Sequence, residues 1–290
     1  MKIHTLTIII FFFISSISFA QRNKTDLQKM NLKGKIVWIE EMEYNSTGKK
    51  RIISREETSQ VTIQKFEFNT KGSIIEENLN SENGIYVVET SNIYDSIGRL
   101  IKSSYYSSYF PNGYWLYMYD NNGNEIETLH YESSSIDNNE TELEYNLEKK
   151  IVKLLDSLEN KVFETIYDGN GQIKSKRLSS YDTNGNLIEI FVYNNVDSLL
   201  QKRILTYDKK GNNIKIQNIG SANYSREGRV DIQYNKLNDI IKQSFYDKNN
   251  VLIEHHEYKY KYDSQKNWIK RVEVLADKSK SVSERKILYR

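Results

Sequence analysis

Apolar and polar residues follow one another along this chain in a short pattern that recurs nine times. An aromatic residue is followed by Asp or Asn, two variable residues and usually Gly, and then by an apolar pair and usually a charge. The copy that runs from Tyr181 to Glu189, YDTNGNLIE, is the clearest. The other copies begin at Phe68, Tyr94, Tyr119, Tyr167, Tyr207, Tyr234, Tyr246 and Tyr262. Such self-similarity predicts one structural unit repeated along the chain.

Each position of the pattern suits a tight β-hairpin. The Asp or Asn side chain accepts a backbone N–H two residues on, which begins a turn. Gly takes a positive φ without strain, so the two variable residues and this Gly predict a three-residue loop with a bulge. The apolar pair then begins the next strand. Because neighbouring strand residues face opposite ways, we expect the Ile on one face, and the charge and the residue before the Ile on the other. Opposite charges from different copies could pair across strands.

Many short strands separated by turns predict an all-β fold: an antiparallel meander of repeated hairpins that forms a curved or spiralling sheet. Residues 25–32 alone suggest a short helix, with Thr25 as its N-cap, and we interpret this segment as a lid over the first strand. A meander has two edges, for which residues 35–44 and 286–290 are the candidates. Unprotected edges would favour self-association of the protein.

The N-terminus carries the pattern of an export signal. Lys2 precedes an apolar run over residues 6–14, and the small residues Ser18 and Ala20 suit a cleavage site after Ala20. A retained membrane anchor is the less favoured alternative, because the run is short for a membrane span. We therefore predict a signal peptide over residues 1–20, an N-terminal segment over 21–34 and a repeat domain over 35–290. The protein is expected in the periplasm or at the cell surface.

The composition argues against several classes of protein: disulfide-linked, nucleic-acid-binding and membrane-spanning. The chain has no Cys and hence no disulfide, and its net charge of +2 argues against nucleic acid as a partner. A lipid-spanning barrel needs an unbroken apolar outer face. Here Lys or Glu recurs within the strands, polar residues such as Ser103 interrupt the Ile side, and the mean hydropathy is −0.68. We therefore expect no membrane span once the signal is removed.

The iterated Tyr-Asp-x-x-Gly-x-Leu-Ile pattern resembles the YD repeats of the Rhs family over roughly residues 35–290. The resemblance implies hairpins that wind into a large curved sheet outside the cytoplasm. Large Rhs proteins enclose a toxic C-terminal domain and release it at an Asp-Pro-x-Gly site. The single Pro here, Pro111, follows Phe110, so that site is absent, and nine copies are expected to be too few to close a full shell. A role as accessory component of a toxin or contact-dependent system rests on this analogy alone.

Few residues in the sequence suggest metal binding or catalysis. His255 and His256 are adjacent in a predicted strand and so face opposite ways, which prevents joint metal binding, and His130 stands alone. The run from Asp120 to Asn124 is similar to a calcium loop, but its Gly comes two positions too early for an EF-hand. Turn chemistry accounts for these residues, and we predict no metal, no cofactor and no catalytic residue. Scattered carboxylates leave a glycan-acting enzyme open as an alternative.

The surplus of aromatic residues is the better guide to function. The 22 Tyr exceed what the turns require, and a group of aromatics surrounds the turn at residues 111–113: Tyr105, Tyr106, Tyr109, Trp115 and Tyr117. The favoured interpretation is cross-strand packing inside a curled sheet. The alternative is a stacking surface for a glycan or a peptide. The sequence therefore predicts a non-enzymatic binding or structural module whose ligand is a glycan or a protein.

Overall fold

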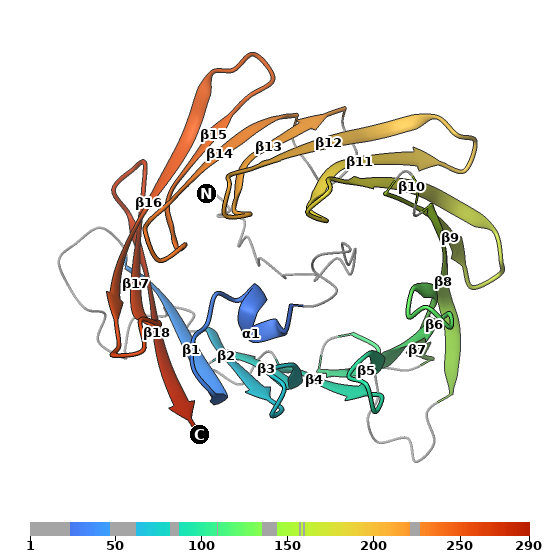
Figure 1. The fold of residues 1–290 in the computed structure, drawn as a ribbon, viewed down its shortest axis with the longest axis horizontal. Coiled ribbons are helices and arrows are strands. Elements are labelled where there is room, and N and C mark those ends of the chain that lie inside the picture. The colour runs from blue at the N-terminus through green and yellow to red at the C-terminus, as the bar shows by residue number, and fades with distance from the viewer. Residues whose placement is uncertain are drawn as a thin grey trace.

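The computed structural model describes residues 24–46, 62–81, 87–108, 110–134, 144–156, 158, 160–220 and 227–290. Eighteen antiparallel strands and one short helix make up this part of the chain (Figure 1). The predicted signal peptide and Tyr109 lie outside it. The elements are α1 (Asp26–Lys29), β1 (Ile36–Ser46), β2 (Thr62–Phe68), β3 (Ile74–Ser81), β4 (Val87–Tyr94), β5 (Leu100–Ser107), β6 (Gly113–Tyr119), β7 (Glu125–Ser133), β8 (Tyr145–Asp156), β9 (Lys161–Asp168), β10 (Ile173–Tyr181), β11 (Leu187–Asn194), β12 (Leu199–Tyr207), β13 (Asn213–Ile219), β14 (Gly228–Tyr234), β15 (Ile240–Tyr246), β16 (Leu252–Tyr262), β17 (Trp268–Leu275) and β18 (Lys280–Tyr289).

The sheet closes into a barrel. Each strand pairs with its neighbours in sequence, and β1 pairs with β18 as well as with β2, in a register that runs from Ile36↔Tyr289 to Ser46↔Lys280. The prediction of an antiparallel meander is confirmed, but the expected spiralling sheet is wrong. The two expected edges, residues 35–44 and 286–290, belong to strands that pair with each other, so the ground for edge-to-edge self-association disappears. Nine hairpins suffice because strand twist and tilt bend them into one ring.

The turns have the predicted chemistry. In the first copy, Asn69 Oδ1 accepts the amides of Lys71 and Ser73, and the Gly72 amide donates to the Asn69 carbonyl. Gly72 has a φ of +86°, as a three-residue loop with a bulge requires. The same bonds recur at the other eight copies: Asp95, Asp120, Asp168, Asp182, Asp208, Asn235, Asp247 and Asp263.

A second bulge, at the Ile of the pattern, changes which side chains share a face. Tyr119 pairs with Glu125 and Met118 pairs with Glu127, so Ile126 is left between two ladder pairs. Since Met118 and Tyr119 face opposite ways, Glu127 lies on the face opposite to Glu125. The expectation that the charge and the residue before the Ile share a face is therefore wrong. The same shift occurs before Phe68, Tyr94, Tyr181, Tyr207, Tyr234, Tyr246 and Tyr262.

The N-terminal segment lies inside the ring of strands (Figure 1). Thr25 caps α1 in a capping box with Gln28, as the sequence predicts, although the helix spans only four residues. Leu27 and Met30 pack against a buried apolar cluster formed by Leu32, Ile36, Ile39, Phe66, Phe68 and Ile74. These strand residues therefore face inward. The segment covers the inner face of β1–β3, where burial of its apolar side chains stabilises it.

Hydrogen bonds fix this segment to turns from distant parts of the chain. The Leu27 amide donates to the Gly72 carbonyl, Asn31 Nδ2 to Asp239 Oδ1, and the Lys33 amide to Asn267 Oδ1, at 3.1, 3.0 and 2.8 Å. All three acceptors lie in hairpin loops at the same end of the barrel, after β2, β14 and β16. Among the described residues, no helix has the length and apolar character needed to cross a membrane.

The pattern's aromatic residues tie neighbouring hairpins together from inside. The hydroxyl of Tyr94 donates to the carbonyl of Ile74 at 2.7 Å, and Tyr207 repeats this contact with Leu187 at 2.8 Å. Each acceptor immediately precedes a bulged residue, where the ladder is locally disrupted. Tyr119 and Tyr234 make equivalent bonds to Leu100 and Asn213, and Tyr260, two residues before the last copy begins, makes one to Ile240.

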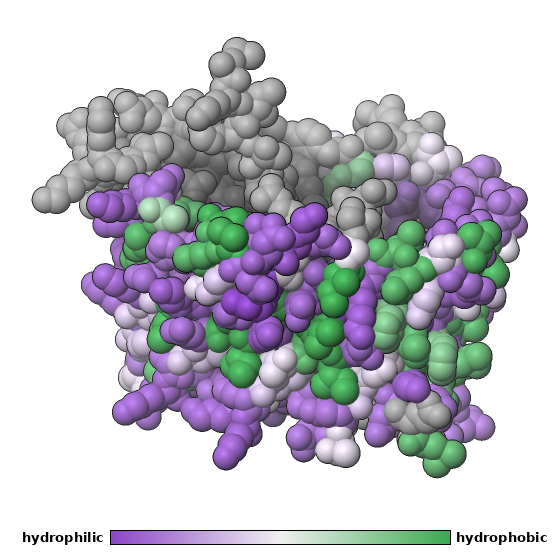
Figure 2. Space-filling model, turned by 90° about the horizontal axis from the view of Figure 1, so that it is seen from above, coloured by the Kyte–Doolittle hydropathy of each residue, from purple (hydrophilic) through white to green (hydrophobic). Residues whose placement is uncertain are grey.

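The outer face mixes apolar and charged side chains, as the hydrophobic residues scattered among hydrophilic ones in Figure 2 illustrate. Ile126 and Leu154 are 41% and 69% exposed. Charges of the repeat pair across strands, but with partners outside the pattern instead of with charges of other copies: Glu127 with Lys150, Glu189 with Lys202, Lys242 with Glu257, Lys270 with Glu284. The outer wall therefore carries ion pairs within its strands.

Candidate functional site

Four neighbouring strands, β5 to β8, bring an aromatic and polar cluster together, which we call the Trp115 cluster: Tyr105, Trp115, Tyr117, His130, Glu132 and Lys149. In the β6–β7 register Trp115 stands opposite His130, and their rings stack with centroids 3.9 Å apart and planes 12° apart. Lys149 Nζ lies 5.7 Å from the centroid of the Trp115 ring. One face of the indole is therefore fixed by a cross-strand partner.

The cluster lies on the inner face of the barrel. Trp115 and Tyr117 alternate with outward residues on β6, and Tyr119 on the same side makes the inward hydroxyl bond described above. Trp115 and Tyr117 are only partly buried. Barrels with this many strands are wider than wall side chains alone can fill, so such residues line the interior of the ring.

Burial and neighbouring charges set the protonation of His130 and Tyr105 in the cluster. The Tyr105 hydroxyl lies 2.9 Å from His130 Nε2 and 3.1 Å from Glu132 Oε1. Burial, and then Lys149, lower the pKa of His130 to about 4, so the imidazole is neutral near pH 7. Burial and Glu132 raise the pKa of Tyr105, which keeps its proton. We assign the tautomer of His130 that carries its proton on Nε2. His130 then donates to the Tyr105 hydroxyl oxygen, and the Tyr105 hydroxyl donates to Glu132, so both contacts are hydrogen bonds.

The structure brings together part of the predicted stacking surface. Tyr105, Trp115 and Tyr117 share the inner face, whereas Tyr106 follows Tyr105 on the strand and lies on the outer face, 39% exposed. Tyr109 is outside the described residues. Sequence reasoning left His130 as an isolated residue and did not single out Glu132 or Lys149, because their proximity depends on the pairing register of β6, β7 and β8.

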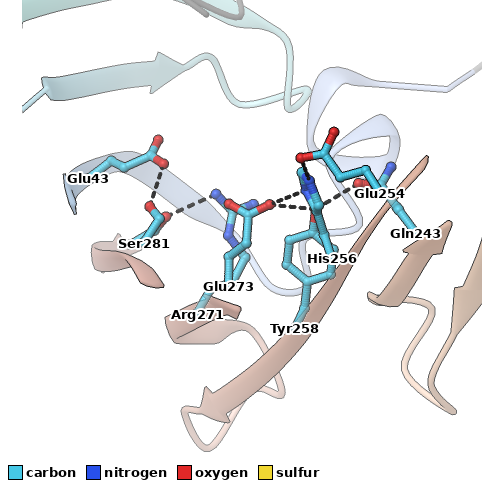
Figure 3. A network of polar contacts seen from close by, with 9 residues as sticks. Glu43, Gln243, Glu254, His256, Tyr258, Arg271, Glu273 and Ser281 are labelled. Carbon is cyan, nitrogen blue, oxygen red and sulfur yellow. Dashed lines mark hydrogen bonds and ion pairs between the residues drawn. The ribbon is translucent and has the colours of Figure 1, made fainter. Parts of the chain in front are cut away.

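A second polar cluster lies on β15–β18 and β1 (Figure 3). His256 sits between two carboxylates, with Nδ1 2.7 Å from Glu273 Oε1 and Nε2 2.9 Å from Glu254 Oε1. The hydrogen bond to Glu273, followed by that to Glu254, raises the pKa of His256. Tyr258 donates to Glu273 at 2.9 Å, and Gln243 is also within reach of its hydroxyl. This geometry stabilises an imidazolium, since both ring nitrogens then donate.

A buried ion pair joins the two strands that close the barrel. Arg285 on β18 donates to Glu41 on β1 at 2.9 Å, and these side chains are 9% and 17% exposed. The Arg285 guanidinium lies 3.4 Å from the ring centroid of Trp268, itself 7% exposed. Arg271 is a second cation near Glu41, at 3.7 Å. The seam of the barrel is therefore held by charge as well as by backbone bonds.

Within the part of the chain that the structure describes, no three His, Asp or Glu side chains are grouped so that they could hold a metal ion. His255 and His256 do not form a pair: in the β15–β16 register His255 stands opposite Ser244 and His256 opposite Gln243, on opposite faces. The run from Asp120 to Asn124 is occupied by turn bonds, with Asp120 Oδ1 accepting two amides and Oδ2 the Asn124 side chain.

No protein-family model and no curated protein matches this chain. Among solved structures, a porin-like protein from Bacteroides uniformis matches with a TM-score of 0.46 and 9% identity, covering 87% of this chain and 96% of that one. A TcdB2-TccC3 structure matches with a TM-score of 0.32 and 14% identity, covering 78% of this chain and 14% of that one.

Proposed function

We propose that this protein is an exported, non-catalytic β-barrel that binds a glycan or a peptide on its inner face, at the Trp115 cluster. The observation that carries the proposal is a partly buried indole, stacked on His130 and bordered by Tyr105, Glu132 and Lys149. Ligand sites typically combine aromatic surface with a few fixed polar groups. An amphipathic ring such as Trp or Tyr supplies stacking area, and its polar neighbours supply direction.

The cluster is ordered before any ligand arrives. His130 supports one face of the Trp115 ring, and the Tyr105 hydroxyl is held by His130 and Glu132. Side chains that are already fixed lose less conformational entropy on binding, which favours affinity. A neutral His130 also leaves Glu132 and Lys149 as the charged groups around the indole.

The outer wall supports a location in the periplasm or at the cell surface, in water. Lys150, Lys202 and Lys270 lie within strands on the outer face and pair there with carboxylates. An outward Lys near the midplane of a bilayer costs about 2–4 kcal/mol, so this wall suits water better than lipid. Export itself rests on the signal-like residues 1–20.

The test is a glycan and peptide array probed with the purified protein, followed by titration of any hit. Trp115→Ala should abolish binding and preserve the β-sheet circular dichroism. Tyr106→Ala is the matched control, because it removes a ring from the same hairpin on the outer face and should leave binding unchanged. Equal loss of binding in both variants would argue against the inner-face site.

A glycan-acting enzyme is the second candidate, favoured by the two carboxylates that converge on His256. Glu273 and Glu254 would then provide the acid–base pair that such chemistry needs. Release of reducing sugar from a polysaccharide by the parent protein, lost in Glu273→Gln, would favour this candidate. Unchanged release in Glu273→Gln would point to a contaminating enzyme and reject it.

A further inference from the structure

A cavity of about 320 Å³ lies at the barrel end where the N-terminal segment, the loop after β2 and the end of β18 meet. Leu27 and the fully buried Ile36 provide its apolar lining. Three bases also line it: Lys35 immediately before β1, Lys71 from the loop after β2, and Arg290 after β18. These residues are far apart in sequence and are brought together by closure of the barrel.

The three bases have no side-chain counter-ion among the residues that line the cavity. No carboxylate side chain lines the cavity, and none of Lys35, Lys71 or Arg290 makes an ion pair with the described residues. Arg290 Nη2 donates to the Phe68 carbonyl at 2.9 Å, which fixes the guanidinium but does not neutralise it. Lys71 Nζ reaches the Ser96 carbonyl only at 3.4 Å.

The carboxylate of the neighbouring helix is already engaged. Asp26 Oδ2 accepts the Ile74 amide at 2.8 Å, and Oδ1 pairs with Lys29 at 3.1 Å. Like charges around one small cavity repel one another, and a bound anion would convert that repulsion into attraction. An Arg fork together with Lys ammonium groups suits a tetrahedral oxyanion, which offers several acceptor oxygens at once.

We propose that this cavity binds a phosphate-type oxyanion, either free or carried on a larger molecule such as a lipid headgroup. The site is independent of the Trp115 cluster. Because its bases come from the residue before β1, the first hairpin loop and the C-terminal end of the last strand, the bound anion would link the elements that meet at the seam. Binding to the folded state alone then raises the melting temperature with phosphate concentration.

The experiment compares thermal unfolding and isothermal titration in inorganic phosphate and in chloride at equal ionic strength. The parent protein should bind phosphate saturably and melt at a higher temperature in it. Lys35→Gln and Lys71→Gln should each weaken binding about fivefold or more, and the double variant should lose it. Lys286→Gln is the control, because it removes one charge from β18 on the outer wall, where Lys286 pairs with Glu40. No difference between phosphate and chloride, or equal loss in Lys286→Gln, would overturn the proposal.

A second arm distinguishes the source of the anion. The protein is floated with vesicles of phosphatidylcholine, with and without phosphatidic acid. Saturable phosphate binding without flotation identifies a soluble ligand. Flotation only with phosphatidic acid, reversed by Lys35→Gln together with Lys71→Gln, identifies a headgroup. If the parent protein floats with pure phosphatidylcholine and the double variant still does so, another surface binds lipid. That result would overturn the headgroup assignment.

Discussion

Removing the charge of Glu41 tests whether the seam contributes to stability as the geometry indicates. Glu41→Gln keeps the shape of the side chain and an acceptor oxygen but leaves Arg285 without its anionic partner. Arg285 is 9% exposed, donates to Glu41 at 2.9 Å and stacks on Trp268 at 3.4 Å, so its charge cannot turn to water without breaking the packing. Breaking one partner of a buried ion pair costs about 3–5 kcal/mol. That is a large share of a typical unfolding free energy of about 5–15 kcal/mol.

The assay is urea unfolding followed by Trp fluorescence. Glu284→Gln is the matched control, since it removes one carboxylate from β18 in a pair with Lys270 whose two side chains are each 37% exposed. An exposed pair is worth about 0–1 kcal/mol, so this variant should unfold close to the parent. If both variants lose the same small amount of unfolding free energy, burial of the Arg285 charge does not depend on Glu41, and the seam is not held by this ion pair. A second variant that replaces both partners, Glu41→Leu with Arg285→Met, should recover much of the loss.

Two further predictions concern the inner face. Tyr207→Phe removes the hydroxyl that reaches the Leu187 carbonyl before the bulge, and it should lower the unfolding free energy by about 1–3 kcal/mol in the same urea assay; no loss would mean that water replaces the hydroxyl. The imidazoles of His130 and His256 should give the free energy of unfolding opposite pH dependences. The folded pKa of His130 is lowered to about 4, so its contribution falls as pH drops from about 6.5 towards 4, because the unfolded chain binds the proton first. The pKa of His256 is raised, so its contribution is complete below about 6.5 and is lost as pH rises through the folded value. His130→Gln should flatten the acid limb and His256→Gln the limb above 6.5 in melting curves, and the reverse assignment would contradict the hydrogen bonds described.

Local chemistry could be predicted from the sequence because it acts over a few residues. The Asp or Asn at the second position and the positive φ at the fifth determine each turn, and all nine turns form as expected. The bulge at Ile126 was not predictable from alternation, since it appears only in the register between strands. Closure depends on the accumulated bend of every hairpin, which brings residue 36 opposite residue 289.

The candidate site, like the fold, could be predicted from the sequence only in part. Alternation along β6 places Trp115 and Tyr117 on one face, and alternation along β5 separates Tyr105 from Tyr106. His130 could not be assigned to Trp115 from sequence, because only the register of β6 with β7 sets them opposite each other. The Arg285–Glu41 pair depends on residues that are far apart in the chain and meet only when the barrel closes.

Closure of the barrel is the central claim, and a disulfide across the seam tests it most directly. Glu40 and Lys286 are opposite each other on the outer face of β1 and β18, and the chain has no native Cys. Paired residues in antiparallel strands have Cα atoms about 4.5–5.5 Å apart, within the range of about 4.4–6.8 Å that a disulfide needs. Under mild oxidation, Glu40→Cys with Lys286→Cys should form an intramolecular disulfide that changes the mobility of the unfolded monomer on a gel. The control, Glu40→Cys with Lys215→Cys on β13, should remain reduced. A seam pair that stays reduced, or that links only separate molecules, would contradict the closed barrel.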